Sequence, residues 1–407
     1  MQISPAMAAC EAPPVMEARR WVAGATFPPE RPLINVSQAA PVEPPPEALR
    51  QAMAEAVLHA DATHLYGPVL GLPDLRAEVA AQVSDAYGGT VAPENVAITA
   101  GCNQAFAAAL SVLAGPGDEV ILPTPWYFNH KMWLDMASVT TVPLPPGPGL
   151  VPRVADAAAA ITERTRAIVL VTPNNPAGVE YPAETVAAFA DLARERGVAL
   201  IVDETYRDFD SRPGAPHDLF ADPGWEETVI QLYSFSKAYR LTGHRVGAMV
   251  AGGPFLAHVE KFLDTVAICA PQLGQRAALW GMRNLRQWLA GERAEILDRR
   301  AAVEEAFAGL ADRGWALEGS GAYFAYVRHP FDEASDALAK RLVQEAGVLC
   351  LPGTMFMPQA GAGADWGGGR AHLRIAFANA DRAGIGRLAD RLAAVSGPRL
   401  ASRAAGG

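Results

Sequence analysis

Short apolar runs alternate with amphipathic stretches through the middle of the chain. The runs have the length of strands and lie at residues 96–99, 119–122, 167–172, 198–203, 229–232 and 245–251. The stretches between them, such as 103–113 and 182–196, repeat apolar residues at helical spacing. Strands that are apolar along their whole length and alternate with helices predict a mostly parallel sheet covered by helices on both faces.

The pattern differs at the two ends of the chain. Residues 1–46 are rich in Pro and Ala, which predicts an irregular arm, and helical spacing follows at 47–61 and 72–87. After about Pro271 we expect a long helix at 284–313, a strand at 322–328, a helix at 332–345 and a strand at 372–378. The predicted division is an arm that also joins the small domain (1–46), a large domain (47–283), a small α+β domain (284–395) and a disordered tail (396–407).

Composition and charge narrow the class of protein. Of the 407 residues 50% are hydrophobic and 19% are charged, which is typical of a globular protein with a large core. The net charge of −10, without any block of like charges, argues against nucleic acid and anionic membranes as partners. Residues 1–14 do not have the pattern expected of a secretory signal, no apolar run is long enough to cross a bilayer, and the four cysteines form no metal motif. We therefore expect a cytoplasmic protein without a metal site.

Lys237 is one of only four lysines, and it follows the buried run 229–232 across a Ser-Phe-Ser turn. A desolvated lysine favours the neutral amine, which is the form that attacks a carbonyl carbon. Taken alone, a solvated loop lysine is the better interpretation. Ser234, Ser236 and Arg245 flank it, however, and hydroxyls with a guanidinium are suited to a phosphate monoester.

Other polar residues stand where expected strands end. The turn Gly101-Cys102-Asn103 opens a helix, whose N–H groups can face an anion, although a plain strand–helix turn explains it equally. Asp203 closes the run 198–203, where parallel sheets place ligand groups, and it could keep a pyridinium nitrogen protonated. Alternatively Asp203 or Glu204 caps the next segment or pairs with an arginine. Asn175 lies in a turn and could donate to a phenolate oxygen.

In this order the segments resemble the class I/II aminotransferases, a family of fold type I pyridoxal 5′-phosphate (PLP) enzymes. The matching segments are Tyr66-Gly67, residues 71–76, 99–105, 123–127, 175–178, 203–206, 234–237, 243–247 and 373–375, within a resemblance that extends over about 33–392. The resemblance implies a three-layer α/β/α fold with a mostly parallel sheet, and a smaller α+β domain built from the two chain ends.

The resemblance also implies a role for each matching residue. Lys237 is implied to form an imine with PLP and to carry the proton between substrate and cofactor, with Asp203 and Tyr206 as the other catalytic residues. Tyr127 is implied to stack on the ring, with Trp126 as the alternative, and Tyr66 to reach the neighbouring subunit of a homodimer with shared active sites. The implied cofactor-binding set is Lys237, Gly101, Cys102, Asn103, Tyr127, Asn175, Asp203, Tyr206, Ser234, Arg245 and Tyr66.

The residues implied to bind the substrate match the family less completely than those implied to bind the cofactor. Arg374 resembles the arginine that grips the substrate α-carboxylate, with Asn175 and Ala40 beside it, but Ala40 stands where the family usually has Gly. Residues 264–275 contain no Arg for a second carboxylate, which argues against a strict aspartate specialist but leaves 2-oxoglutarate open as an acceptor. His130 is either a partner of Asp203 or a structural histidine. The Gly-dense stretch 355–370 is either a mobile lid over the site or a disordered surface loop.

The implied activity is transfer of an amino group from an L-amino acid to a 2-oxo acid by a ping-pong mechanism. A PLP-dependent lyase, decarboxylase or cyclising enzyme on the same fold is the main alternative, because the fold alone does not fix the reaction. A PLP-sensing transcriptional regulator would need a DNA-binding domain, for which residues 1–46 are too short and too rich in proline. The amino donor and the acceptor stay open.

Overall fold

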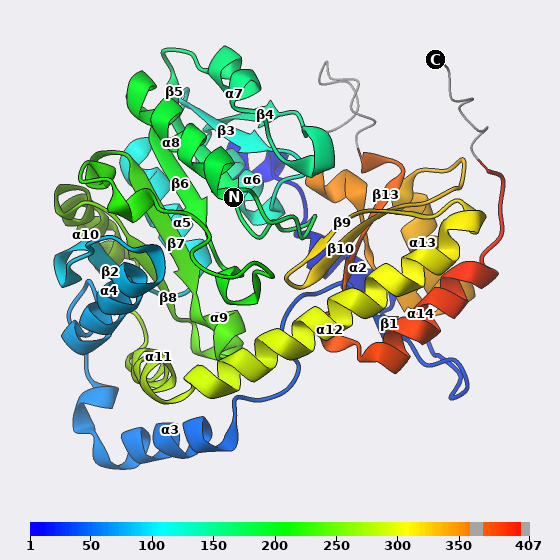
Figure 1. The fold of residues 1–407 in the computed structure, drawn as a ribbon, viewed down its shortest axis with the longest axis horizontal. Helices are drawn as coiled ribbons and strands as arrows, with labels where there is room; N and C mark the ends of the chain where they lie inside the picture. Colours follow the sequence, from blue (N-terminus) through cyan, green and yellow to red (C-terminus); the bar gives the residue numbers. More distant parts are fainter. Residues whose placement is uncertain (359–368, 400–407) are drawn as a thin grey trace.

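A seven-stranded sheet lies at the centre of the computed structural model, which describes residues 1–358 and 369–399 (Figure 1). Its order is β2-β8-β7-β6-β5-β3-β4, and only β8 runs antiparallel to its neighbours. The strands are β2 (Val96–Thr99), β3 (Glu119–Pro123), β4 (Thr140–Leu144), β5 (Thr165–Val171), β6 (Ala199–Asp203), β7 (Val229–Ser234) and β8 (Gly247–Val250). The predicted mostly parallel sheet is confirmed.

Helices cover both faces of this sheet, which explains the continuous apolar runs. On one face α4 (Pro73–Tyr87), α8 (Ala183–Arg196) and α11 (Gln272–Asn284) pack against side chains such as Leu200 and Val202. On the other face α5 (Cys102–Leu113), α6 (Phe128–Met136) and α10 (Gly253–Ala267) enclose Ile201. The remaining helices of this part are α3 (Glu47–His59), α7 (Val154–Ala160) and α9 (Phe235–Ala238).

A second, antiparallel sheet forms the smaller part of the molecule, as the α+β pattern predicts. Its order is β12 (Leu351–Pro352), β13 (His372–Ala376), β10 (Phe324–Arg328) and β9 (Ala316–Gly321), with α13 (Ser335–Ala346) and α14 (Arg382–Ala394) beside it. The long helix α12 (Arg286–Leu310) runs from the large sheet to the small one (Figure 1). Near the N-terminus β1 (Ile34–Asn35) pairs with β11 (Val348–Leu349), so both ends of the chain meet here.

Three local expectations need correction. Residues 1–46 are not wholly irregular, because α1 (Pro5–Ala9) and α2 (Pro14–Trp21) each begin with a proline, whose fixed φ suits the first helical position. The long helix begins at Arg286, since Asn284 ends α11. The last strand of the large sheet begins at Gly247, because Arg245 has a φ of +47°.

The C-terminal end of the described chain is held in place rather than free. Arg399 forms a β-bridge with Phe331, and the Asp332 N–H donates to the Pro398 carbonyl at 2.9 Å. Residues 400–407 of the expected tail, and most of the Gly-dense stretch 355–370, lie outside the described residues. Of the helices described, none combines the length and the apolar composition needed to cross a bilayer.

Candidate active site

The carboxyl ends of β5, β6 and β7 meet the N-terminus of α5 around a cavity of about 310 Å³. This is the edge at which parallel sheets place ligands. The residues that line the cavity come from the part of the molecule with the large sheet and from the N-terminal segment: Gln38, Ala40, Cys102, Asn103, Tyr127, Val171, Asn175, Asp203, Thr205, Tyr206, Ser234, Ser236, Lys237, Thr242 and Arg245. The structure therefore brings most of the predicted site residues together.

Lys237 lies in α9, the short helix that follows β7 directly. The Ser234 hydroxyl caps this helix by accepting the Ser236 N–H at 3.3 Å. Burial lowers the pKa of the Lys237 amine to about 8, and the positive charges of Arg245 and Arg374 act in the same direction. About one tenth of the amine is therefore neutral at pH 7, far more than for an ordinary lysine.

Asp203 ends β6 and is only 3% exposed. Its Oδ2 atom lies 3.2 Å from His130 Nε2, and its Oδ1 atom accepts the Thr205 hydroxyl at 2.7 Å and the Thr205 N–H at 3.0 Å. Burial alone would raise the pKa of this carboxyl, but the contacts with His130 and Thr205 outweigh burial and lower it. The predicted contact of His130 with Asp203 is confirmed, and the carboxylate stays ionised at the bottom of the cavity.

Glu204 points to the opposite face of the sheet, as the alternation of side chains along a strand requires. It is fully buried, accepts the Tyr87 hydroxyl at 2.8 Å and lies 3.3 Å from His217. Gln231 donates to it as well. Of the two adjacent acids, only Asp203 lines the cavity.

One end of the cavity is built to receive an anion. Gly101 precedes α5 with a φ of +89°, and a Cβ atom there would lie 2.2 Å from Nη2 of Arg245. The Arg245 guanidinium can approach the helix N-terminus this closely only because position 101 has no side chain. Ser234 and Thr242 add hydroxyls that line the same cavity.

Aromatic residues border the cavity on another side. Tyr127 lines it and accepts a hydrogen bond from Asn129 at 2.8 Å, whereas Trp126 is buried in the apolar cluster around α5 and does not line it. Tyr206 is buried against Tyr323, and burial raises the pKa of its phenol well above the usual value. Tyr206 is therefore a hydrogen-bond donor at neutral pH.

Arg374 of β13 in the small sheet lies beside the cavity, next to Asn175, but is not among the residues that line it, and it is 2% exposed. Its Nη1 donates to Asn175 Oδ1 at 2.9 Å, its Nη2 donates to the Ser37 carbonyl, and Phe324 and Phe356 stack near its guanidinium at 5.0 Å. Burial lowers the pKa of this guanidinium to about 10, so it is still charged at neutral pH. Within the described part of the chain its Nε has no hydrogen-bond partner.

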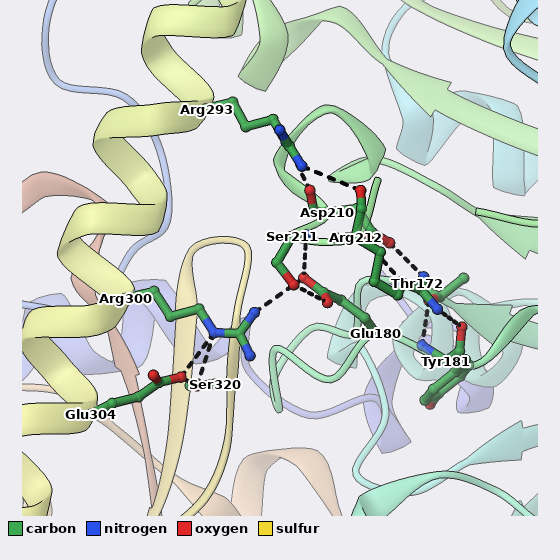
Figure 2. A network of polar contacts seen from close by, with 10 residues as sticks. All are labelled: Thr172, Glu180, Tyr181, Asp210, Ser211, Arg212, Arg293, Arg300, Glu304 and Ser320. Atoms are coloured by element: carbon green, nitrogen blue, oxygen red, sulfur yellow. Dashed lines mark hydrogen bonds and ion pairs between the residues drawn. The ribbon is translucent and has the colours of Figure 1, made fainter. Parts of the chain in front are cut away.

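The loops that carry Asn175 and Tyr206 are fastened to α12 by the polar network of Figure 2. Arg300 of α12 pairs with Glu180 at 3.2 Å, and Glu180 also accepts the Ser211 N–H at 2.7 Å. Arg293, two helical turns earlier, donates to the Asp210 carbonyl at 2.8 Å. These contacts fix the loops after β5 and β6 against the helix that leads into the small sheet.

Some residues fall outside the predictions. Tyr66 is 79% exposed and does not line the cavity. Gln38, Val171, Thr205 and Thr242 line it but were not among the predicted site residues. Thr205 could have been foreseen, since an aspartate side chain commonly accepts the backbone N–H of the residue two positions later.

Comparisons with known proteins agree with this geometry. The family model for aminotransferase class I and II matches residues 31–392. The arginine–pyruvate transaminase of Pseudomonas aeruginosa is 32% identical over 323 residues, 77% of this chain and 80% of that protein. The valine–pyruvate aminotransferase of Mycobacterium tuberculosis is 31% identical over 362 residues, 85% of this chain and 87% of that protein.

Solved structures with a similar fold are also aminotransferases. The solved structure of N-succinyldiaminopimelate aminotransferase from Mycobacterium tuberculosis has a TM-score of 0.83 at 27% identity, over 96% of this chain and 100% of that chain. The Thermus thermophilus aspartate aminotransferase with maleate has a TM-score of 0.85 at 24% identity, over 97% and 99%. The predicted fold type I architecture is confirmed. The chain belongs to the class I and II aminotransferases and is an enzyme that transfers amino groups.

Proposed function

We propose that the cavity binds PLP at Lys237 and that the enzyme moves the amino group of an L-amino acid to a 2-oxo acid in two half-reactions. The observation that carries this proposal is the combination of a neutral-prone lysine, an ionised buried carboxylate and an anion-binding end in one cavity. When bound, PLP supplies an aldehyde for the amino group and a pyridinium ring that withdraws electrons from the substrate Cα.

The residues present fit this cofactor. Arg245, Ser234 and the N-terminus of α5 offer donors for a phosphate, while Asp203 offers a carboxylate for a protonated ring nitrogen. Asn175 and Tyr206 would hold the phenolic oxygen. The absence of a side chain at Gly101 is independent support, because it lets the Arg245 guanidinium lie against the N-terminus of α5.

Three side chains of the protein act on the substrate and on the cofactor ring. Arg374, with its Nε free of partners among the described residues, binds the substrate α-carboxylate. Neutral Lys237 takes the proton from the substrate Cα and passes it to the cofactor. Asp203 keeps the ring nitrogen protonated because its own pKa is low.

We further propose a substrate with an uncharged side chain. The charged residues among those lining the cavity are Asp203, Lys237 and Arg245, all of which the cofactor uses. Gln38 and Ala40 are neutral lining residues to which no cofactor contact is assigned, and they are available for the side chain. The Mycobacterium tuberculosis relative named for valine and pyruvate suggests these as the first pair to test.

The homodimer belongs to the same proposal. Large apolar side chains are exposed together at the end of α3, after it, and at the end of α10: Val57, Leu58, Leu65, Tyr66, Val266 and Ile268. The two segments adjoin, since the Gly67 N–H lies 3.5 Å from Cys269 Sγ. An exposed patch of this kind is typical of a protein interface, from which Tyr66 could reach a neighbouring subunit.

A donor and acceptor screen on the purified protein tests the function. With PLP added, we expect a visible absorbance change on adding a neutral amino acid, release of its 2-oxo acid, and return of the spectrum on adding pyruvate. Parallel lines in double-reciprocal plots would show the ping-pong order. Carbon dioxide or ammonia as the product, without an oxo acid and without return of the spectrum, would contradict transamination.

A further inference from the structure

Arg240 lies three residues after Lys237 and has a backbone conformation that arginine rarely adopts. Its φ is +56°, and Arg245 at the other end of the same turn has a φ of +47°. This turn also carries Thr242, so with Lys237 in the helix before it the segment 237–245 places three cavity-lining side chains. Non-glycine residues keep such conformations only where surrounding contacts hold them.

Glu292 of α12 supplies the first of these contacts. Arg240 donates from Nε to Oε2 of Glu292 at 3.0 Å and from Nη2 to Oε1 at 2.9 Å, which is a two-pronged pair. Trp288, one helical turn earlier, stacks near the guanidinium at 5.4 Å. Both charged side chains are less than one quarter exposed, so solvent and salt screen the pair less than a surface pair.

The same guanidinium contacts the N-terminal segment. Its Nη1 forms an ion pair with Glu43 and lies 3.5 Å from the Pro44 carbonyl. The neighbouring residues Gln38 and Ala40 line the cavity. One side chain therefore joins α12, the turn after Lys237 and the segment 38–44, at the point where α9 lies beside the first turns of α12 (Figure 1).

We propose that Arg240 is a positioning residue of the active site, which holds the turn of Lys237 and the segment 38–44 against α12 through Glu292 and Glu43. This inference rests on the proposed role of Lys237 as the amine that binds PLP. The competing explanation is that Arg240 only stabilises the fold. The two differ at the cavity, because a fold contact alone leaves the Lys237 environment unchanged in the folded protein.

The test uses Arg240→Gln, Arg240→Lys and Glu292→Gln in the full-length protein. Glu295→Gln is the matched control, since Glu295 lies on the same helix but pairs within it, with Arg299. The first readout is methylation of lysine amines in the PLP-free protein between pH 6 and 11, quantified by peptide mass spectrometry. Lys131, Lys261 and Lys340 serve as internal references. The second readout is the PLP dissociation constant from equilibrium dialysis.

We expect Arg240→Gln and Glu292→Gln to raise the apparent pKa of Lys237 from about 8 towards its ordinary 10.5, because a loosened turn admits water. The PLP dissociation constant should rise about tenfold. Arg240→Lys should give values of both quantities between those of the wild type and Arg240→Gln, since lysine keeps the charge but cannot form the two-pronged pair with Glu292. Glu295→Gln should match the wild type in both readouts.

Two outcomes separate the competing explanations. Variants with wild-type lysine reactivity and PLP affinity but a lower melting temperature would overturn the proposal and leave a fold contact. If Arg240→Gln does not fold, Glu292→Gln decides the question, because it keeps Arg240 and the shape of its partner. A wild-type protein that neither binds PLP nor shows a reactive Lys237 would instead refute the proposed function.

Discussion

The Asp203 carboxylate is ionised in a buried place because His130 and Thr205 replace the water it has lost. The change His130→Phe keeps a ring to stack on Phe106, which now lies 3.9 Å from the His130 ring, but removes one hydrogen-bond partner. We expect a loss of about 1–3 kcal/mol in the free energy of unfolding at pH 7. Urea denaturation checks this.

The pH dependence of that loss gives a further check. The lowered pKa of Asp203 adds stability above its unfolded pKa, and this part disappears as the pH falls through the lower, folded value. His130→Phe should therefore cost less stability at acidic pH than at pH 7. An equal cost at both pH values would mean that the histidine acts only by packing.

In the PLP-free protein the lowered pKa of Lys237 reduces the free energy of unfolding, whereas the lowered pKa of Asp203 increases it. Its folded pKa of about 8 lies below the ordinary 10.5, so the unfolded chain binds more protons between these values and stability rises with pH across that window. Lys237→Met removes the buried charge at similar length. We expect the variant to be more stable at pH 7 by an order of 1–3 kcal/mol, and the difference to shrink by pH 10. Urea denaturation at both pH values measures it, and a difference that is constant with pH would contradict it.

At the scale of the element, the N-terminus of α5 depends on Gly101. We expect Gly101→Ala to lower stability by about 1 kcal/mol, because of its positive φ, and to weaken PLP binding at least about tenfold by displacing Arg245. Gly117→Ala is the control, since Gly117 has a φ of +91° with no atom within 4 Å of the added Cβ. Equilibrium dialysis should show normal PLP affinity for Gly117→Ala. Similar PLP affinity in both variants would contradict the expectation that a side chain at position 101 displaces Arg245.

Six of the seven strands of the large sheet could be predicted because they are buried on both faces, whereas the edge strand β4, of which only Leu144 is buried, was missed. A strand such as β5 then reads as an unbroken apolar run, and the polar residues that end it stand out. The order of these strand ends along the chain was sufficient to bring Lys237, Asp203 and Asn175 together. Helices α1 and α2 were missed because short helices that begin with proline have the composition of a loop.

Contacts made over long sequence distances could not be predicted. Gln38 reaches the cavity only because β1 pairs with β11, more than 300 residues later, and no local pattern indicates that pairing. The register between Trp126 and Tyr127 was also open, since the two rings are adjacent and only packing around α5 buries Trp126. The division of the chain at 46, 283 and 395 stays a prediction.

At the scale of the whole molecule, the apolar patch around Leu65 and Tyr66 decides whether one chain is sufficient for activity. A charge at Leu65, which is exposed here, would be costly only if another surface covers it. We therefore expect Leu65→Glu to convert a dimer into monomers in light scattering and to weaken PLP binding. Met7→Glu, at an exposed position on α1, should leave a dimer with wild-type affinity.

The change Tyr66→Phe then separates assembly from the shared site. It removes one hydroxyl and keeps the apolar ring, so the dimer should persist while PLP binds several-fold more weakly, by about 1 kcal/mol for one lost hydrogen bond. Equilibrium dialysis beside light scattering reads both quantities from one sample. A dimer with unchanged PLP affinity would leave Tyr66 as an interface residue and place every cofactor contact within a single chain.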